Sequence, residues 1–302
     1  RYVGDHIAVV IANSLEKARS AAEKITIDLD VLPPVVDLST AIGNTQIHDE
    51  MDDNVYFDWE LGDESATASA LESAAKIVEL TVTNNRVIPN AMEPRAAVAE
   101  YDETNESYTL YTTSQNPHLT RLVMAAFMMQ IPESKLHVVA PDVGGGFGSK
   151  IYIYPEEAVC TWATKKLRRP IKWTADRSEA FLGDAHGRDH VNKVKIGLDQ
   201  DNKIVGLRVD TLANLGAYLS AFSMVTPTYL HGTLLSGCYN IPAIYTNVKG
   251  VCTTTVNVDA YRGAGRPEAT YLLERTMDYA ARQVGMDPAE FRRINFIPKD
   301  AF

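Results

Sequence analysis

Two glycine-rich stretches place small residues beside cations, a pattern typical of loops that receive an anion or a cofactor. The first, "DVGGGFGSK" at residues 142–150, joins an apolar run to a segment with helical periodicity. The second, "AYRGAGRPEATY" at 260–271, sets Arg262 beside three small residues at a helix start. Glycine lets a ligand approach the main chain, and exposed N–H groups donate hydrogen bonds to anionic oxygens. Taken alone, the first stretch is equally well explained as a tight turn, and the second is better explained as a plain loop.

Neither common phosphate-binding template fits the first stretch. A Walker loop requires G-x-x-x-x-G-K-[ST], but Gly148 is followed by Ser149 and only then by Lys150. A Rossmann fingerprint that begins at Gly144 would need a third glycine or an alanine where Ser149 stands. Consecutive glycines can still offer N–H groups to an anion or to the oxygens of a cofactor. A generic anion or nucleotide binder therefore stays open as one alternative.

Composition places the chain among acidic globular proteins and argues against several function classes. Its 302 residues are enough for one large domain or two, and 45% of them are hydrophobic. A net charge of −10 without a basic tract argues against nucleic acid and against a membrane surface as partners. Three scattered cysteines predict a reducing, cytoplasmic location without a disulfide framework. The sequence contains no CxxC pair, so no zinc or iron–sulfur site is expected within this chain.

Hydrophobic periodicity predicts an α+β protein with a small α/β unit in front. Residues 1–43 are expected to form strand "HIAVVIA", a helix capped by Ser14, and strand "TIDLDVLPPVVD". Residues 44–66, rich in Asp, Glu, Asn and Gly, predict an irregular connector. Residues 67–302 alternate strands and helices and close with a long helix. The first glycine stretch is expected between a buried strand and the helix "PEEAVCTWATKKL".

Several polar side chains outside the glycine stretches are expected to be structural. Glu93, in "NAMEPRAAV", is predicted to support the fold without taking part in catalysis. His186, Arg188 and His190 crowd one segment, and solvation at the surface explains them as well as a binding site does. Tyr261 is predicted to be a packing residue that holds its loop.

Three motifs in one order resemble the molybdenum hydroxylase family, which includes xanthine dehydrogenase, aldehyde oxidoreductases and aerobic carbon monoxide dehydrogenase. The motifs are "TTSQNPH" at residues 112–118 followed by the two glycine stretches, and the resemblance covers nearly the whole chain. It implies part of the molybdopterin-binding large subunit. Residues 1–43 would be the second part of an α/β hammerhead domain, 44–66 a connector, and 67–302 the first molybdopterin-binding domain.

The resemblance also implies which positions face the cofactor. These are Gln115, Gly146, Phe147, Gly148, Arg262, Gly263 and Ala264. Gln115 would hydrogen-bond a ligand of molybdenum, the amides of Phe147 and Gly148 would face the molybdopterin, and the Arg262 loop would line the metal's other side. An amide suits this role because it donates to an oxo group without adding a group that titrates. No side chain of this chain would bind the metal, because the family holds it through the pterin dithiolene.

Departures from the purine-oxidising members of the family narrow the substrate. Those members carry a glutamate where Ile151 stands and a stacking phenylalanine where Ala264 stands. They also carry an arginine near the position of Leu230. Loss of the charged pair and the ring removes several orienting contacts, so purines are disfavoured. Ile151 and Ala264 are expected to line an apolar substrate pocket.

The copper-containing carbon monoxide dehydrogenases carry a cysteine directly after the loop arginine, where this chain has Gly263. Without that thiolate there is no obvious copper ligand. The expected reaction is therefore oxidation of an aldehyde to a carboxylic acid with water as the oxygen source. The alternatives are a hydroxylase of an aromatic N-heterocycle and a carbon monoxide dehydrogenase-like enzyme without the copper cysteine. An alternative of another class is a non-catalytic fragment or assembly module.

The resemblance finally implies partners. The cofactor would be molybdopterin in its cytosine dinucleotide form with molybdenum, while iron–sulfur clusters and FAD would lie on partner subunits. The family's general base is a glutamate in a second molybdenum-binding domain, so no catalytic residue is expected in this chain. We expect the chain to be a fragment or one piece of a split large subunit. It would associate with the remaining part of the large subunit, an iron–sulfur subunit and an FAD subunit.

Overall fold

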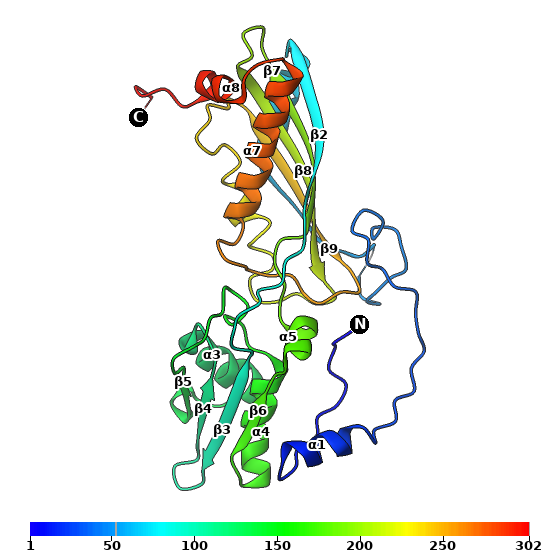
Figure 1. Ribbon diagram of the computed structural model, residues 1–302, viewed down its shortest axis with the longest axis vertical. Coiled ribbons are helices and arrows are strands. Elements are labelled where there is room, and N and C mark those ends of the chain that lie inside the picture. Colours follow the sequence, from blue (N-terminus) through cyan, green and yellow to red (C-terminus); the bar gives the residue numbers. More distant parts are fainter. Residues whose placement is uncertain (52, 302) are drawn as a thin grey trace.

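A computed structural model describes residues 1–51 and 53–301 and divides them between two lobes (Figure 1). The upper lobe in that view holds a five-stranded sheet, and the lower lobe holds a four-stranded sheet. The α+β class expected from the sequence is confirmed. None of the helices in the described residues is both long enough and apolar enough to cross a membrane.

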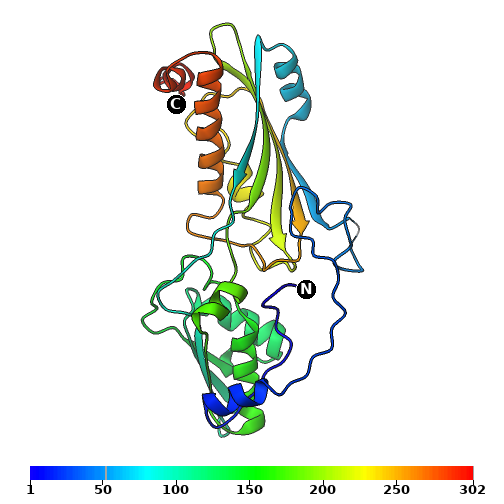
Figure 2. The ribbon, with the colours of Figure 1, turned by 45° about the vertical axis from the view of Figure 1, so that its right-hand side comes forward.

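The five-stranded sheet contains one parallel pair of strands among antiparallel neighbours. In spatial order its strands are β1 (Val55–Gly62), β9 (Ile244–Cys252), β8 (Ile204–Gly216), β7 (His190–Leu198) and β2 (Lys76–Asn84). Only β8 and β9 run parallel within it. Parallel strands end at the same edge of a sheet, so both strands direct their carboxyl ends at the lower lobe (Figure 2).

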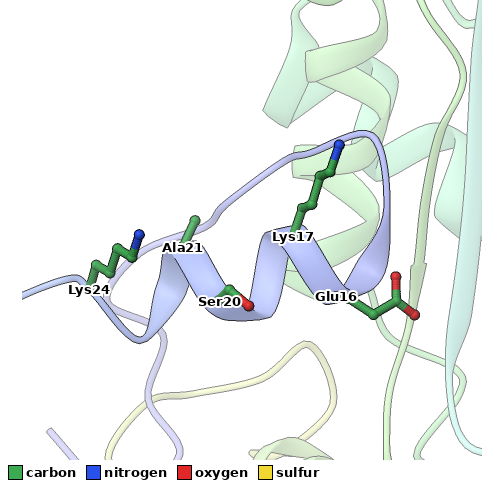
Figure 3. Close-up of a pocket in the computed structure, with 5 residues that line it drawn as sticks. All are labelled: Glu16, Lys17, Ser20, Ala21 and Lys24. Carbon is green, nitrogen blue, oxygen red and sulfur yellow. The ribbon is translucent and has the colours of Figure 1, made fainter.

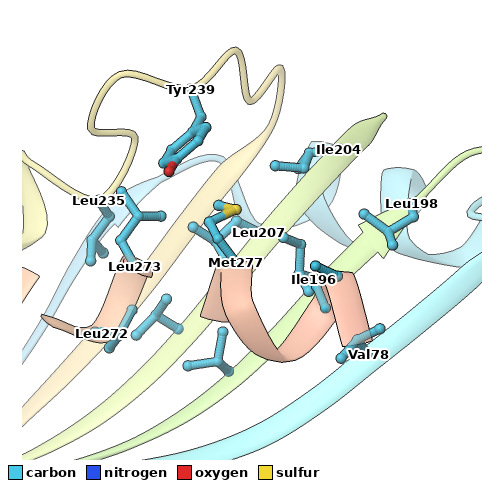
Figure 4. Close-up of a cluster of buried hydrophobic side chains, with 14 of the residues drawn as sticks. Val78, Ile196, Leu198, Ile204, Leu207, Leu235, Tyr239, Leu272, Leu273 and Met277 are labelled. Atoms are coloured by element: carbon cyan, nitrogen blue, oxygen red, sulfur yellow. The ribbon is translucent and has the colours of Figure 1, made fainter. Parts of the chain in front are cut away.

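Helix α7 (Arg266–Gln283) covers one face of this sheet because its apolar residues recur at helical spacing. The buried positions on the helix are Ala269, Leu272, Leu273, Thr276, Met277, Ala280 and Ala281. Figure 4 shows this stripe lying on apolar side chains of the strands, including Val78, Ile196 and Leu207. The short helices α2 (Glu64–Glu72) and α8 (Pro288–Asn295) pack beside this core, α2 on the sheet face opposite α7 (Figure 2).

The lower lobe is an insertion between β2 and β7, which are neighbours in the upper sheet. In spatial order its strands are β5 (Leu136–Val139), β4 (Ser107–Thr112), β3 (Ala96–Asp102) and β6 (Ile171–Thr174). Its helices are α3 (Pro117–Val123), a π-helical turn at Met124–Met129, a 3₁₀ turn at Glu133–Lys135, α4 (Pro155–Leu167) and α5 (Arg177–Gly183). Strands β4 and β5 are parallel, and their carboxyl ends face the upper lobe (Figure 1).

The expected strands near the start of the chain are wrong. Before β1 the described residues contain one regular element, the helix α1 (Leu15–Ala22), which Ser14 caps as expected. A strand requires hydrogen bonds to a neighbouring strand, and these segments pair with none in the described part of the chain. Most of their apolar side chains face solvent, whereas Val35 is buried against Val251 and Cys252 of β9. Val31 is 91% exposed and Leu29 is 65% exposed. The assignment of residues 1–43 to a separate domain stays a prediction.

The irregular connector expected at 44–66 is wrong in its second half, where Val55–Gly62 forms β1. This strand lies at the edge of the sheet and pairs only with β9. An edge strand tolerates charged residues such as Asp58 and Glu60 because one side of it remains in water. Its polar composition therefore concealed the strand.

Candidate functional site

The three sequence motifs meet where the two lobes face each other. We call this region the interlobe junction and define it by the loops 113–116, 140–154 and 253–265. The first two loops follow the parallel strands β4 and β5, and the third follows β9, whose carboxyl end points at the lower lobe. The sheet topology thus delivers all three motifs to one place.

Gln115 lies against the glycine loop in a single, fixed orientation. Its Oε1 accepts a hydrogen bond from the N–H of Gly148 at 2.8 Å, and its own N–H donates to the carbonyl of Lys150 at 2.8 Å. A Cβ atom at Gly146 would lie 2.3 Å from Oε1, so a glycine is required there for the amide to fit. Because a main-chain N–H must meet the oxygen end of the amide, Nε2 is left as the donor. No described residue accepts a hydrogen bond from that Nε2.

The glycine loop and the Arg262 loop touch backbone to backbone. The N–H of Arg262 donates to the carbonyl of Phe147 at 2.8 Å, and its guanidinium lies 5.7 Å from the Phe147 ring centre. A Cβ at Gly148 would lie 2.2 Å from the carbonyl oxygen of Ala260. Phe147 has a φ of 55°, a strained conformation for a residue with a side chain, and such residues cluster at functional sites.

One expected contact is corrected by this geometry. The amide of Gly148 was expected to face the cofactor, but it donates to Gln115 instead. Its contribution is therefore indirect, because it orients the side chain that carries a free donor. The N–H groups of Phe147 and Gly263 have no acceptor among the described residues, so they are available to a ligand.

Glu93 and Lys150 fasten the start and the end of the glycine loop to each other. The Lys150 ammonium donates to the carbonyl of Glu93 at 2.8 Å and to its Oε2 at 2.9 Å, and the N–H of Gly144 donates to the same carboxylate at 2.8 Å. Burial raises the pKa of Glu93, but these donors outweigh it and hold the pKa below its usual value. Glu93 thus has the supporting role expected for it. Lys150 is 2% exposed and ion-paired, so it is not free to bind a nucleotide phosphate.

His186, Arg188 and His190 are buried, so the expected surface solvation of this segment is wrong. Arg188 forms an ion pair with Glu268 at 2.9 Å, and its guanidinium lies 4.9 Å from the centre of the Tyr261 ring. Burial, and then the charge of Arg188, lowers the pKa of His190 to about 4, and burial followed by the charge of Arg86 lowers that of His186 to about 4. Both histidines are therefore neutral at pH 7, and Tyr261 packs as expected.

Asp259 is a buried carboxylate that sequence reasoning missed. It accepts hydrogen bonds from the Tyr152 hydroxyl at 2.6 Å, from the N–H of Phe222 at 3.1 Å and from the Ser220 hydroxyl. Burial raises its pKa, although these donors counteract the effect. Asp259 connects the segment after the glycine loop with two loops of the upper lobe. Its position directly before "AYRG" is the only signal that the sequence offered.

The residues expected to line a substrate pocket are also at the junction. Ile151 is partly buried and packs with Tyr152, Tyr154 and Ala260, and Ala264 adopts a φ of 36° in the Arg262 loop. Neither lines the two surface depressions that the structure shows near β1 and α1. One, of about 330 Å³, follows the exposed face of α1 between Glu16 and Lys24 (Figure 3). The other, of about 180 Å³, lies between β1, β9 and the segment 232–236.

The junction residues fit a group rich in oxygen atoms. The available donors are the Gln115 amide, the N–H groups of Phe147 and Gly263, and the exposed guanidinium of Arg262. Glu93, which lies beside the glycine loop, is bound by Lys150 and Gly144, and the Glu268 carboxylate of the third motif is bound by Arg188. Free N–H groups and an exposed guanidinium attract an anionic or oxo-bearing ligand.

Comparison with known proteins also indicates a cofactor-binding domain. Residues 47–296 match the molybdopterin cofactor-binding domain family. The carbon monoxide dehydrogenase large chain of Hydrogenophaga pseudoflava is 36% identical over 98% of this chain. Quinoline 2-oxidoreductase from Pseudomonas putida 86 superposes with a TM-score of 0.93 at 33% identity over 100% of this chain. Aldehyde oxidoreductase from Desulfovibrio gigas superposes with a TM-score of 0.84 at 26% identity over 96% of this chain.

The chain spans only part of each of these proteins. It covers 39% of the carbon monoxide dehydrogenase large chain, 38% of the quinoline oxidoreductase chain and 31% of the aldehyde oxidoreductase chain. Within that shared part the fold agrees with that of the two solved structures. The chain belongs to the molybdenum hydroxylase family, of which it carries a molybdopterin cofactor-binding domain.

Proposed function

We propose that this chain forms one wall of the molybdopterin site in a hydroxylase that oxidises an aldehyde to a carboxylic acid, with water as the oxygen source. The observation that carries the proposal is the orientation of Gln115. Its oxygen is fixed by Gly148, and its Nε2 is left as a donor beside the exposed Phe147 and Arg262. Such a preorganised donor costs no reorganisation when negative charge develops on an oxygen atom.

The bound molybdenum cofactor supplies the two-electron oxidation, and the residues of this chain hold and orient its surroundings. Gln115, whose Oε1 already accepts from Gly148, would donate its Nε2 hydrogen to an oxygen of the cofactor, and the N–H groups of Phe147 and Gly263, which have no acceptor among the described residues, would donate to it as well. Gly146 and Ala264 leave room for the ring system and the substrate because their side chains are small. Ile151 adds an apolar surface next to this space.

The remaining features of the complete enzyme are part of the same proposal. Residues 1–43 would belong to a hammerhead domain and 67–302 to the first molybdopterin-binding domain. The cofactor would be the cytosine dinucleotide form, and a glutamate outside this chain would serve as the general base. Iron–sulfur and FAD subunits in the cytoplasm would carry the electrons away.

An aromatic N-heterocycle is the second candidate substrate. The chain is 33% identical to quinoline 2-oxidoreductase but 26% identical to the aldehyde oxidoreductase. The exposed ring of Phe147 could also stack on an aromatic substrate. An aldehyde remains the first choice because Ile151, Gly263 and Ala264 offer no charged group that would orient a ring nitrogen.

Metal analysis of the holoenzyme, with release of pterin and nucleotide, tests the cofactor. We expect stoichiometric molybdenum and cytidine monophosphate, and a preparation without molybdenum would contradict the proposal. Steady-state assays with aldehydes, N-heterocycles, carbon monoxide and xanthine test the substrate. We expect turnover of aldehydes and negligible turnover of xanthine and carbon monoxide. Rapid turnover of a heterocycle with aldehydes inert would establish the second candidate.

A further inference from the structure

A strained turn lies just before β7, behind the Arg262 loop. Arg188 has a φ of 66° and Asp189 a φ of 69°, so two consecutive residues with side chains adopt the left-handed conformation. Such conformations persist only when the surroundings impose them, and they concentrate at functional sites. Here Arg86 holds the turn from one side, because its Nε donates to Asp189 at 2.7 Å.

The turn directs the Arg188 guanidinium at the main chain of the Arg262 loop. Its Nη1 donates to the carbonyl of Tyr261 at 2.8 Å and to Glu268 at 2.9 Å. Its Nη2 donates to the carbonyl of Arg262 at 2.9 Å. The planar guanidinium thus binds two successive carbonyls and a carboxylate at once, an arrangement that an ammonium group cannot reproduce.

These two hydrogen bonds decide the direction of two peptide groups. In a trans peptide the C=O and the N–H point in opposite directions. Since the Tyr261 carbonyl faces Arg188, the N–H of Arg262 faces the other way, and it donates to Phe147 at 2.8 Å. Since the Arg262 carbonyl faces Arg188 too, the N–H of Gly263 faces away from Arg188, and no described residue accepts from it.

We propose that Arg188 is a positioning residue of the cofactor site. It fixes the orientation of the peptides 261–262 and 262–263. As a result the N–H of Arg262 bonds to the glycine loop, and the N–H of Gly263 is left as a free donor for the cofactor. The carbonyls of Gly263 and Ala264 accept from Arg266, at 3.2 and 3.3 Å. Every carbonyl oxygen from 261 to 264 thus accepts a hydrogen bond from an arginine. None of them is left unpaired where it would repel an anionic group. The part of this inference that concerns the cofactor rests on the proposed function.

The test must separate positioning from simple neutralisation of Glu268, a carboxylate that is 1% exposed. Arg188→Met alone leaves that charge buried and unpaired, which destabilises a fold whatever else the arginine does. The double variant Arg188→Met with Glu268→Gln removes the buried charge, so we expect it to fold, but the two carbonyls still lack their donor. Arg188→Lys keeps the positive charge but lacks the planar guanidinium that binds both carbonyls at once.

Arg208→Met provides a matched control. Arg208 also forms ion pairs with carboxylates, Glu64 and Asp210, and lies 5.0 Å from the centre of a tyrosine ring, Tyr245. It lies on β8, paired with Tyr245 of β9, outside the junction. This variant should keep the parental molybdenum content, so it measures what the loss of an arginine ion pair costs by itself.

The measurements are molybdenum and pterin content of the holoenzyme, the Mo(V) electron paramagnetic resonance signal, amide hydrogen exchange at 262–263, and the melting temperature. For the double variant we expect a melting temperature close to that of Glu268→Gln. We also expect an altered Mo(V) signal, faster exchange at Arg262, and cofactor affinity lower by about tenfold or more, since two charge-assisted hydrogen bonds are lost. Arg188→Lys should recover these properties only in part.

Parental cofactor content, resonance signal and exchange in the double variant would show that Arg188 only neutralises Glu268, and would overturn the inference. If the parent enzyme contains no molybdenum, the proposed function fails. The exchange rate at Arg262 then decides the role of Arg188 by itself, because that measurement does not require the cofactor.

Discussion

At the scale of single residues, the chemistry of the junction depends on which end of an amide faces the ligand. Gln115 is exposed, yet its orientation is not free, because Gly148 donates to its oxygen at 2.8 Å. Because the loop occupies Oε1 of Gln115, the amide offers only its Nε2 donor to a ligand. Glu93 and Lys150 fasten the loop that does this.

Gln115→Ala should lower turnover much more than stability. The variant loses a donor at a place where preorganised donors are typically worth about 2.7–4 kcal/mol of transition-state stabilisation, so we expect kcat to fall by about 10²–10³. The melting temperature should change little, because an exposed side chain contributes little burial. Steady-state kinetics and thermal unfolding measure the two effects.

Gln283→Ala is the control for this prediction. Gln283 is also exposed, but it lies at the last residue of α7, beyond the buried stripe of that helix. Parental turnover in both variants would show that Gln115 does not act on the reaction.

At the scale of elements, the glycine loop and α4 form one unit with β3 and α5. Arg95, directly before β3, donates two hydrogen bonds to Glu156 in the first turn of α4, at 3.0 and 3.1 Å. It also donates to Asp184, directly after α5, at 2.6 Å, and its guanidinium lies 3.6 Å from the centre of the Tyr154 ring. The helix that follows the glycine loop is therefore anchored at its start.

Glu156→Gln should change how stability depends on pH. Burial raises the pKa of Glu156, but hydrogen bonds from His6 and Arg95 outweigh this and lower it from 4.5 to about 2. A carboxyl with a lowered pKa stabilises the fold above its unfolded value, and that contribution disappears as pH falls through the folded value. At pH 7 the variant should lose on the order of 3 kcal/mol of unfolding free energy. The difference from the parent should shrink between about pH 4.5 and 2.

Denaturant unfolding across this pH range provides the measurement. Glu133→Gln serves as the control, since Glu133 pairs with Arg121 where both side chains are 43% exposed. Exposed pairs contribute little, so this variant should follow the parent at every pH. A constant difference between Glu156→Gln and the parent from pH 7 to 2 would show that the carboxylate charge is not the cause.

Gly148→Ala should move the glycine loop away from the Arg262 loop. Its φ of 113° is unfavourable for alanine, and the new Cβ would meet the Ala260 carbonyl at 2.2 Å, which main-chain atoms can relieve only by moving apart. We expect loss of stability by about 1–3 kcal/mol and a lower molybdenum content. Thermal unfolding and metal analysis report both.

Gly183→Ala is the matched control for the glycine substitution. Gly183 lies in α5, and a Cβ there would have no heavy atom within 4 Å. The substitution should be neutral or stabilising by up to about 1 kcal/mol, since alanine favours helix. If Gly148→Ala behaves in the same way, the close packing of the loops is incorrect.

At the scale of the whole molecule, the lower lobe is inserted between two adjacent strands of the upper sheet, so the chain crosses the junction in both directions. An isolated bridge between Val87 and Gly187 holds the two crossings side by side. Asp259 and Tyr152 then join the lobes directly, with 2.6 Å between the hydroxyl and the carboxylate. The site depends on this contact because each lobe contributes a different loop.

Tyr152→Phe should loosen the two lobes without unfolding either one. The change leaves Asp259 with one donor fewer and removes an acceptor from the N–H of Ala260, which lies 2.9 Å from the hydroxyl. We expect a loss of about 1–3 kcal/mol and faster amide exchange at Ala260. Tyr111→Phe, whose side chain is 41% exposed on β4, should show neither effect. Unchanged exchange in Tyr152→Phe would place the connection between the lobes elsewhere.

The sequence by itself determined the fold class and many of the strands and helices, although it did not indicate β9. Alternation of apolar residues specified β2, β3, β4, β7 and β8, and the spacing of apolar residues specified α7, because these elements bury one face locally. It also indicated Gln115, the glycine loop and the Arg262 loop as candidate cofactor-facing positions. The edge strand β1 was missed because half of an edge strand is polar, and the expected strands at the start of the chain have no partner.

Only the tertiary structure decided which atoms are free to act. The amide of Gly148 is used by Gln115, Lys150 is used by Glu93, and Arg188 is a buried support of the Arg262 loop. These facts follow from contacts between segments more than thirty residues apart, and local propensity carries no information about such contacts. The parallel pairs β4–β5 and β8–β9 bring the segments together, and strand pairing is set by burial across the whole fold.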